Sequence, residues 1–286
     1  MEAKNKRTGG AIIVFAIAFL IFFLYALSLV FAFGWGFISS LKTIPEYTNS
    51  PFGLPAVPQF INYVNAFKKL EFEGVTMPMM VWNSIWFSLG SVLLSLLFTA
   101  LTAYVTSKYH FFGRGFLYAF AVFMMIIPTY GTFVATYRLY HELKMVNSYS
   151  ILLSATGGFT GMNYFLLYSY FKSISPSYSE AASLDGAGHY KIFFSIMLPM
   201  AKPMLISVFM LSFIGKWNDY MAPILYLPEK LTLASGLYKY QEIVMDSGEY
   251  PMLFAGLFLS ILPIIVLFSL LHETMMENMN IGGLKG

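Results

Sequence analysis

Residues 11–37 read AIIVFAIAFLIFFLYALSLVFAFGWGF and contain no Asp, Glu, Lys or Arg. A helix needs about 20 predominantly apolar residues to cross the roughly 30 Å hydrocarbon core of a bilayer. This run is longer, so it predicts a membrane-spanning helix. A signal peptide is the competing interpretation, but its apolar core has only about 7–15 residues. We therefore expect a retained membrane anchor.

Further apolar windows follow along the chain. Five of them are long enough, or nearly long enough, to span a bilayer: Trp82–Ser107, Gly115–Tyr137, Ser148–Phe171, Met204–Tyr226 and Met252–Leu271. Of the 286 residues 58% are hydrophobic and only 11% are charged, whereas soluble domains carry about 25% charged residues. The sequence therefore predicts an all-α integral membrane protein with six transmembrane helices.

The composition also excludes several kinds of site. The chain has no cysteine, which rules out disulfides, zinc–thiolate sites and cysteine nucleophiles. Its four histidines do not share the spacing of metal ligands. A net charge of +3 gives no argument for nucleic acid as a partner. We expect no catalytic residue, no metal site and no cofactor in this chain.

Basic residues suggest how the chain is oriented. Cytoplasmic segments of membrane proteins carry an excess of Lys and Arg, counted over short loops. With a cytoplasmic N-terminus, nine fall inside: Lys4, Lys6, Arg7, Lys108, Arg114, Lys172, Lys191, Lys202 and Lys285. Seven fall outside, three of them in the long loop 38–81. The pattern predicts a multi-pass protein of the cytoplasmic membrane with both termini in the cytoplasm.

The segment 175–199, SPSYSEAASLDGAGHYKIFFSIMLP, joins the fourth and fifth windows. Ser177 followed by Glu180 has the spacing of a capping box, which predicts a helix that starts there. Gly186 can take the left-handed conformation that ends a helix. A second short helix is expected from about His189 until Pro199 stops it. The alternative is an amphipathic segment that rests on lipid headgroups.

This segment also resembles a known family. Glu180-Ala181-Ala182, Gly186 and the run Ile196–Pro199 match the EAA loop of binding-protein-dependent ABC importer permeases. The resemblance implies the type I permease fold and a loop that couples the chain to a separate ATPase. It assigns the coupling contact to seven residues: Glu180, Ala181, Ala182, Asp185, Gly186, Leu198 and Pro199.

Other motifs are similar to the carbohydrate-importing branch of the family. They are Asn83-Ser84, Ala103-Tyr104 with Ser107-Lys108, Phe112-Gly113-Arg114, Ile127-Pro128, Trp217-Asn218-Asp219-Tyr220 with Pro223, and the tail Gly282–Gly286. The tail resembles that of the second, shorter, maltose-type permease subunit. The tail departs from the family pattern at Gly283, where alanine is usual. Outside the tail, Lys216 just before Trp217 is also unusual for the family. The resemblance implies half of a translocation path for a carbohydrate of di- or oligosaccharide size.

The resemblance also implies partners and a domain organisation. The expected partners are a second, non-identical permease, two ATPase subunits, an extracytoplasmic sugar-binding protein and the lipid bilayer. Residues 1–78 would hold the N-terminal tail, the first helix and a long extracytoplasmic loop, irregular around residues 51–58. Residues 79–272 would form a five-helix permease core with the coupling loop, and residues 273–286 a cytoplasmic tail. The phosphate-binding pattern G-x-x-x-x-G-K-[ST] is absent from the sequence, so ATP hydrolysis is expected in the partners and not in this chain.

Two charges interrupt the fifth apolar window. Lys216 and Asp219 are three residues apart and share a helix face. Ionisable groups at such depth usually face an aqueous cavity or one another. One hypothesis places Lys216, Trp217, Asn218, Asp219 and Tyr220 along the translocation path, with Trp217 stacked on a sugar ring. The other is a local ion pair whose lysine extends outward to the interface.

Two other classes of function compete with an importer subunit. An ion-coupled secondary transporter often places acids mid-membrane and shows inverted halves. Here Asp219 is the one candidate acid and no inverted halves are visible. An intramembrane enzyme has little support, because cysteine and metal-ligand spacing are both missing.

Overall fold

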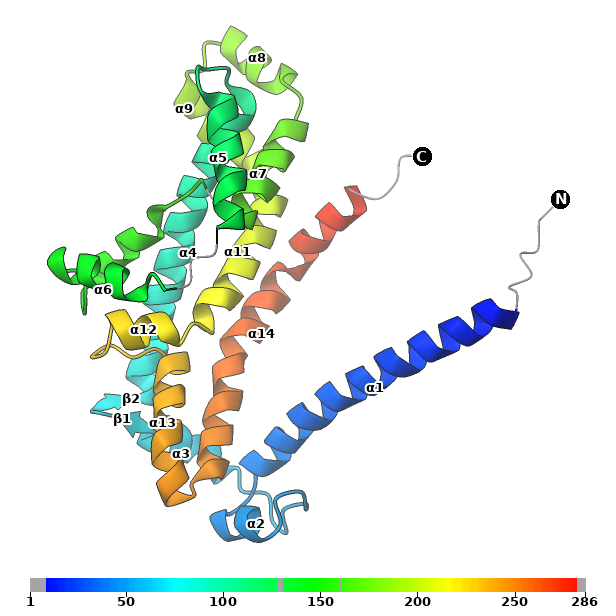
Figure 1. Ribbon diagram of the computed structural model, residues 1–286, viewed down its shortest axis with the longest axis vertical. Coiled ribbons are helices and arrows are strands. Elements are labelled where there is room, and N and C mark those ends of the chain that lie inside the picture. The colour runs from blue at the N-terminus through cyan, green and yellow to red at the C-terminus, as the bar shows by residue number, and fades with distance from the viewer. Residues whose placement is uncertain (1–8, 128–130, 160, 282–286) are drawn as a thin grey trace. The chain divides into compact units, whose positions relative to one another are not determined.

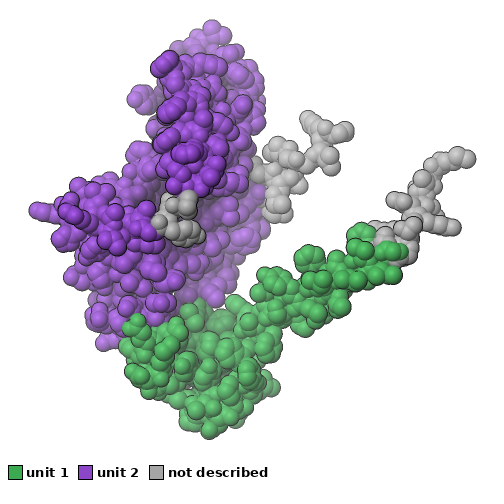
Figure 2. All heavy atoms as spheres, in the orientation of Figure 1, with its two compact units in different colours: residues 1–70, 240–259 green, residues 71–239, 260–286 purple. Residues whose placement is uncertain are grey.

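The computed structural model describes residues 9–127, 131–159 and 161–281 and is predominantly helical (Figure 1). By packing, the chain divides into two compact units, coloured separately in Figure 2. Unit 1 comprises residues 1–70 and 240–259, and unit 2 comprises residues 71–239 and 260–286.

Within the described residues, three helices are long and apolar enough to cross a membrane. They are α1 (Gly9–Ser40), α4 (Met77–Lys108) and α14 (Tyr250–Ile281). They confirm the first, second and sixth predicted spans. None of the apolar window of α1 is buried, so its surface fits a lipid environment.

The other three predicted spans are interrupted in the described residues, so the all-helical membrane fold is confirmed but the count of six transmembrane helices is not. The pieces are α5 (Arg114–Ile126) and α6 (Phe133–Glu142), the 3₁₀ helix η1 (Tyr149–Thr156) and α7 (Met162–Ser173), and α11 (Lys202–Trp217) and α12 (Met221–Tyr226). Glycines explain one break, because Gly161 takes φ +88°, which no regular helix contains. Pro128 lies outside the described residues.

In unit 1, the segment after α1 folds around a buried lysine. Lys42 is almost completely buried, and its ammonium donates to the carbonyl oxygens of Ser50 at 2.9 Å and Pro51 at 2.7 Å. Two short helices flank it, α2 (Ile44–Asn49) and α3 (Ile61–Lys69). Residues 51–58 contain no helix or strand, as expected. The lysine thus supplies the hydrogen bonds that this irregular backbone cannot make for itself.

A capping box starts α2. The Thr43 side chain accepts the N–H of Glu46, and the Glu46 carboxylate accepts the N–H of Thr43 at 2.9 Å. The same carboxylate accepts the N–H of Ala56 at 3.0 Å. These backbone donors lower the pKa of Glu46.

Unit 2 is built around α4, which packs against η1, α7 and α11. A hairpin precedes α4, with β1 (Glu71–Phe72) antiparallel to β2 (Val75–Thr76). Lys239 of α13 (Leu233–Ser247) lies with its Nζ 6.0 Å from the centroid of the Phe72 ring in this hairpin. The other end of the unit carries α8 (Ser177–Leu184) and α9 (His189–Ile192) (Figure 1). Its core is aromatic and includes these buried residues: Tyr104, Tyr164, Leu167, Phe171, Phe193 and Met197.

Close backbone contact joins α4 to the segment before α7. A Cβ at Gly158 would lie 2.6 Å from the carbonyl carbon of Phe98, so only glycine fits here. The Thr102 hydroxyl donates to the Gly158 carbonyl oxygen at 2.7 Å. The contact holds the break in the fourth span against the middle of α4.

Candidate functional site

A cavity of about 530 Å³, lined by both polar and apolar side chains, lies among the spans of unit 2. Residues of α4, α6, η1, α7, α11 and α12 line it. Its serine hydroxyls and one amide come from four of these elements, and the residues are Ser91, Ser95, Ser154, Asn163 and Ser212. In a bilayer such groups are placed where they meet water, solute or one another.

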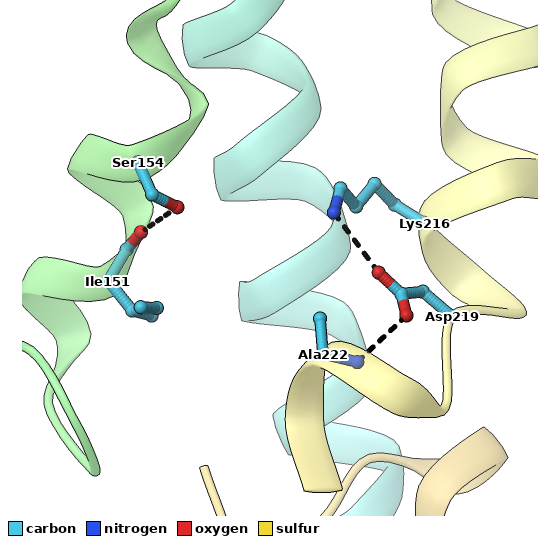
Figure 3. Close-up of polar contacts among 5 residues, drawn as sticks. All are labelled: Ile151, Ser154, Lys216, Asp219 and Ala222. Carbon is cyan, nitrogen blue, oxygen red and sulfur yellow. Dashed lines mark hydrogen bonds and ion pairs between the residues drawn. The ribbon is translucent and has the colours of Figure 1, made fainter. Parts of the chain in front are cut away.

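Two of these polar side chains hydrogen-bond each other. Asn163 of α7 donates through Nδ2 to the Ser212 hydroxyl of α11 at 2.9 Å. On η1, the Ser154 hydroxyl donates to the Ile151 carbonyl oxygen at 2.6 Å (Figure 3). These bonds use one donor on each donating side chain and leave hydroxyl lone pairs and the asparagine carbonyl oxygen free to accept further hydrogen bonds.

An ion pair borders the cavity where α11 ends. Lys216 Nζ lies 3.1 Å from Asp219 Oδ2, with 40% of the lysine and 24% of the aspartate side chain exposed (Figure 3). The other carboxylate oxygen of Asp219 accepts the N–H of Ala222 at 3.0 Å, in the first turn of α12. Asp219 therefore joins the last turn of α11 to the first turn of α12.

The other predicted path residues have different environments. Trp217 is 3% exposed and donates its indole N–H to the Ser260 carbonyl oxygen at 3.0 Å. Its ring is buried in protein contacts, so the expectation that it stacks on a sugar is wrong for this conformation. Asn218 donates to the Ile214 carbonyl oxygen, and Tyr220 stacks on Tyr238 with ring centroids 4.5 Å apart.

Of the five predicted path residues, Lys216 is the one that lines the cavity within the described chain. The serines and Asn163 were missed, because short polar side chains inside an apolar window are indistinguishable from ordinary helix-packing residues. A signal for them was present, since Ser91 and Ser95 recur at the four-residue spacing of one helix face.

The predicted helix-turn-helix is present at the end of unit 2. Gly186 has φ +77°. The N–H of Ala187 bonds the Ala182 carbonyl at 2.9 Å and that of Gly186 bonds the Ser183 carbonyl at 3.1 Å, the Schellman pattern. Asp185 is the C-cap of α8. The left-handed turn expected at Gly186 is confirmed.

The predicted capping box at the start of α8 is wrong. Pro176 is the N-cap and its carbonyl already takes the N–H of Glu180 at 3.1 Å. The Ser177 hydroxyl bonds that of Ser175 instead, at 2.8 Å. The glutamate side chain is left exposed beside Ala181, whereas Ala182 is buried.

Pro199 also does not stop the second helix. After α9 the chain forms a π turn, η2 (Phe193–Met197), and then α10 (Leu198–Met200). Pro199 stands in the first turn of α10, where a missing N–H costs no helical bond. The break comes at Ala201, where the helix axis bends by 75° into α11.

Contacts with the end of α4 hold α9 in place. His189 Nδ1 and Tyr109 Oη lie 3.0 Å apart, and their rings are in edge contact. One turn on, Phe193 packs on Tyr104 with centroids 5.0 Å apart. A displacement of α9 would therefore act directly on α4, which lines the cavity.

No group of three or more His, Asp or Glu side chains placed to hold a metal ion occurs among the described residues. The site thus offers hydrogen-bonding groups and one ion pair.

Comparison with known proteins gives a family match over most of the chain. The profile described as "Binding-protein-dependent transport system inner membrane component" matches residues 10–275. The galactooligosaccharides transport system permease protein GanQ of Bacillus subtilis is 34% identical, over 82% of each chain. The maltodextrin transport system permease protein MdxG of the same organism is also 34% identical, over 71% of this chain and 74% of that one.

A solved structure shares the fold. It is a chain from a bacterial ABC transporter involved in the import of the acidic polysaccharide alginate. It aligns with a TM-score of 0.77 and 24% identity, over 94% of this chain and 99% of that chain.

Proposed function

Because this chain belongs to the family of binding-protein-dependent transport system inner membrane components, we propose that it forms half of the translocation path of an ATP-driven carbohydrate importer. The observation that carries the proposal is the cavity of about 530 Å³ with hydroxyl and amide groups on its walls, within the predicted spans. A solute with many hydroxyl groups can exchange its hydrogen bonds with water for bonds with such walls at little net cost.

The names of the relatives point to the same solute class. The permeases from Bacillus subtilis are described as serving galactooligosaccharide and maltodextrin transport. A carbohydrate of di- or oligosaccharide size is therefore the proposed solute of this chain.

The helix pair α8–α9 is the proposed contact with the ATPase. The chain carries no G-x-x-x-x-G-K-[ST] sequence, so hydrolysis is assigned to two separate ATPase subunits. Glu180, Ala181, Asp185 and Gly186 are exposed on this end of the unit. Closure of the ATPases would move α9 and, through Tyr109 and Phe193, the end of α4.

The remaining partners follow from the architecture of such importers. The proposed complex contains a second, non-identical permease that completes the path, and an external sugar-binding protein. Both termini of this chain are assigned to the cytoplasmic side, because the excess of basic residues in short loops is on that side.

Reconstitution tests the function directly. The chain would be co-purified with its companion permease, ATPase and binding protein, and uptake of radiolabelled galactotriose and maltotriose into proteoliposomes measured. We expect uptake of at least one trisaccharide that requires ATP and the binding protein, and none with this chain alone. Uptake driven by a proton or sodium gradient without ATP would identify an ion-coupled secondary transporter instead.

A further inference from the structure

We propose that the Lys216–Asp219 ion pair makes the cavity selective for uncharged saccharides over saccharides that carry carboxylates. The inference rests on the proposed transport of carbohydrate and adds the charge class of the solute.

Lys216 is the one lining residue with a formal charge in the part of the chain that the structure describes. Asp219 does not line the cavity, but its Oδ2 holds the lysine ammonium at 3.1 Å. The pair is neutral as a unit. Burial of charges in a membrane domain is costly unless they are paired, so the neutral wall is the stable state of the empty site.

The ammonium keeps hydrogen-bonding capacity toward the cavity. A lysine has three N–H donors and no acceptor, and Asp219 takes one of them. Nζ also lies 5.5 Å from the centroid of the Phe87 ring, a second stabilising contact for the cation. Two donors remain for the hydroxyl oxygens of an uncharged sugar, which can bind them while the ion pair persists.

An acidic sugar would change the net charge of the cavity. Its carboxylate would have to draw Lys216 from Asp219 or stand unpaired beside the neutral pair. In either case the cavity acquires one net negative charge for each carboxylate that enters it, away from bulk water. Asp219 cannot follow the lysine, because its Oδ1 is held by the N–H of Ala222 at 3.0 Å.

The substitution Asp219→Asn removes the negative charge of the pair with little change of side-chain shape. The amide oxygen can still accept the Ala222 N–H, so the start of α12 keeps its cap. The partner of Lys216 becomes uncharged, and the wall gains one net positive charge. A carboxylated saccharide then supplies the missing counter-charge.

The experiment compares two trisaccharides that differ at C6, galactotriose with hydroxymethyl groups and galacturonotriose with carboxylates. Binding to the complete purified importer, without its binding protein, is measured by saturation-transfer NMR. The matched control is Glu142→Gln, which removes the same charge from an exposed ion pair. That pair, Arg138–Glu142, spans 2.9 Å on α6, with side chains 83% and 60% exposed, and does not line the cavity.

The wild-type complex and Glu142→Gln should prefer galactotriose at least about tenfold, the ratio that about 1.4 kcal/mol of differential binding gives. Asp219→Asn should reduce this preference at least about tenfold. An unchanged preference in Asp219→Asn, or no measurable galactotriose binding by the wild-type complex, would overturn the selectivity proposal. In those cases ATP-dependent trisaccharide uptake would still be observed if the proposed function is correct. Failure of the selectivity proposal can therefore be distinguished from failure of the proposed function.

Discussion

Tyr109 Oη and His189 Nδ1 lie 3.0 Å apart and join the end of α4 to the helix that follows the Gly186 turn. The contact connects the proposed ATPase-binding end to a helix that lines the cavity. In a close-packed protein, a rigid contact of this kind transmits a displacement that a flexible loop would absorb.

Removal of this hydrogen bond should weaken coupling. Tyr109→Phe keeps the ring contact and deletes the hydroxyl. We expect ATPase subunits to co-purify normally, with stimulation of hydrolysis by the binding protein reduced about two- to tenfold, the range for loss of one hydrogen bond. Tyr25→Phe, on an exposed position of α1, is the control. Normal stimulation in Tyr109→Phe would show that the bond carries no coupling.

At Gly186 a substitution should be harmful when the new residue disfavours positive φ, and its side-chain volume alone should matter little. A Cβ there meets nothing within 4 Å, but φ is +77°. Gly186→Val should therefore strain the turn and misdirect α9, because β-branched residues disfavour positive φ. ATPase co-purification should fall sharply, whereas Gly186→Asn should retain most of it.

Gly188 provides the matched control for this turn. It also has open space at Cβ, but its φ is −71°. Gly188→Ala should bind the ATPase as the wild type does. Equal ATPase binding by Gly186→Val and Gly188→Ala would remove the turn from the coupling mechanism.

The contact between Gly158 and α4 should be intolerant of even one methyl group. In Gly158→Ala the Cβ would overlap the Phe98 backbone, which cannot move aside as a flexible side chain would. We expect the free energy of unfolding to fall by about 1–3 kcal/mol. The purified complex should therefore show a lower midpoint of thermal unfolding. Gly157→Ala, whose Cβ meets open space, should leave the midpoint close to that of the wild type. Identical midpoints would contradict the close approach.

The start of α2 should loosen in acid. The backbone bonds to Glu46 lower its pKa, so its stabilising contribution is complete above the ordinary value of about 4.3. It is lost as the pH falls through the lower pKa of the folded state. Amide exchange at Ala56, corrected for the intrinsic pH dependence, should accelerate over that range.

Glu46→Gln should exchange faster at neutral pH and lose this pH dependence. Glu71→Gln, which removes an exposed carboxylate from β1, should behave as the wild type. A wild-type profile without any acid acceleration at Ala56 would contradict the contribution of Glu46.

The sequence alone determined that this is a helical membrane protein, since apolar length and missing charge are local properties. It also located the Gly186 turn, because glycine is the residue that tolerates positive φ at least cost. The Lys216–Asp219 pair was foreseen as one of two outcomes, since residues three apart on a helix are neighbours. Each of these three features depends on residues that are close together in the sequence.

Tertiary structure decided the rest. Trp217 packs against Ser260 and not in the cavity, and Ser91, Ser154, Asn163 and Ser212 meet around one space only because four elements converge there. The Pro176 carbonyl, and not the Ser177 hydroxyl, accepts the N–H of Glu180, a competition between two acceptors for one N–H that spacing cannot decide. A linear pattern fixes which face of a helix a side chain occupies, but the packing of helices decides whether that face meets protein, lipid or a cavity.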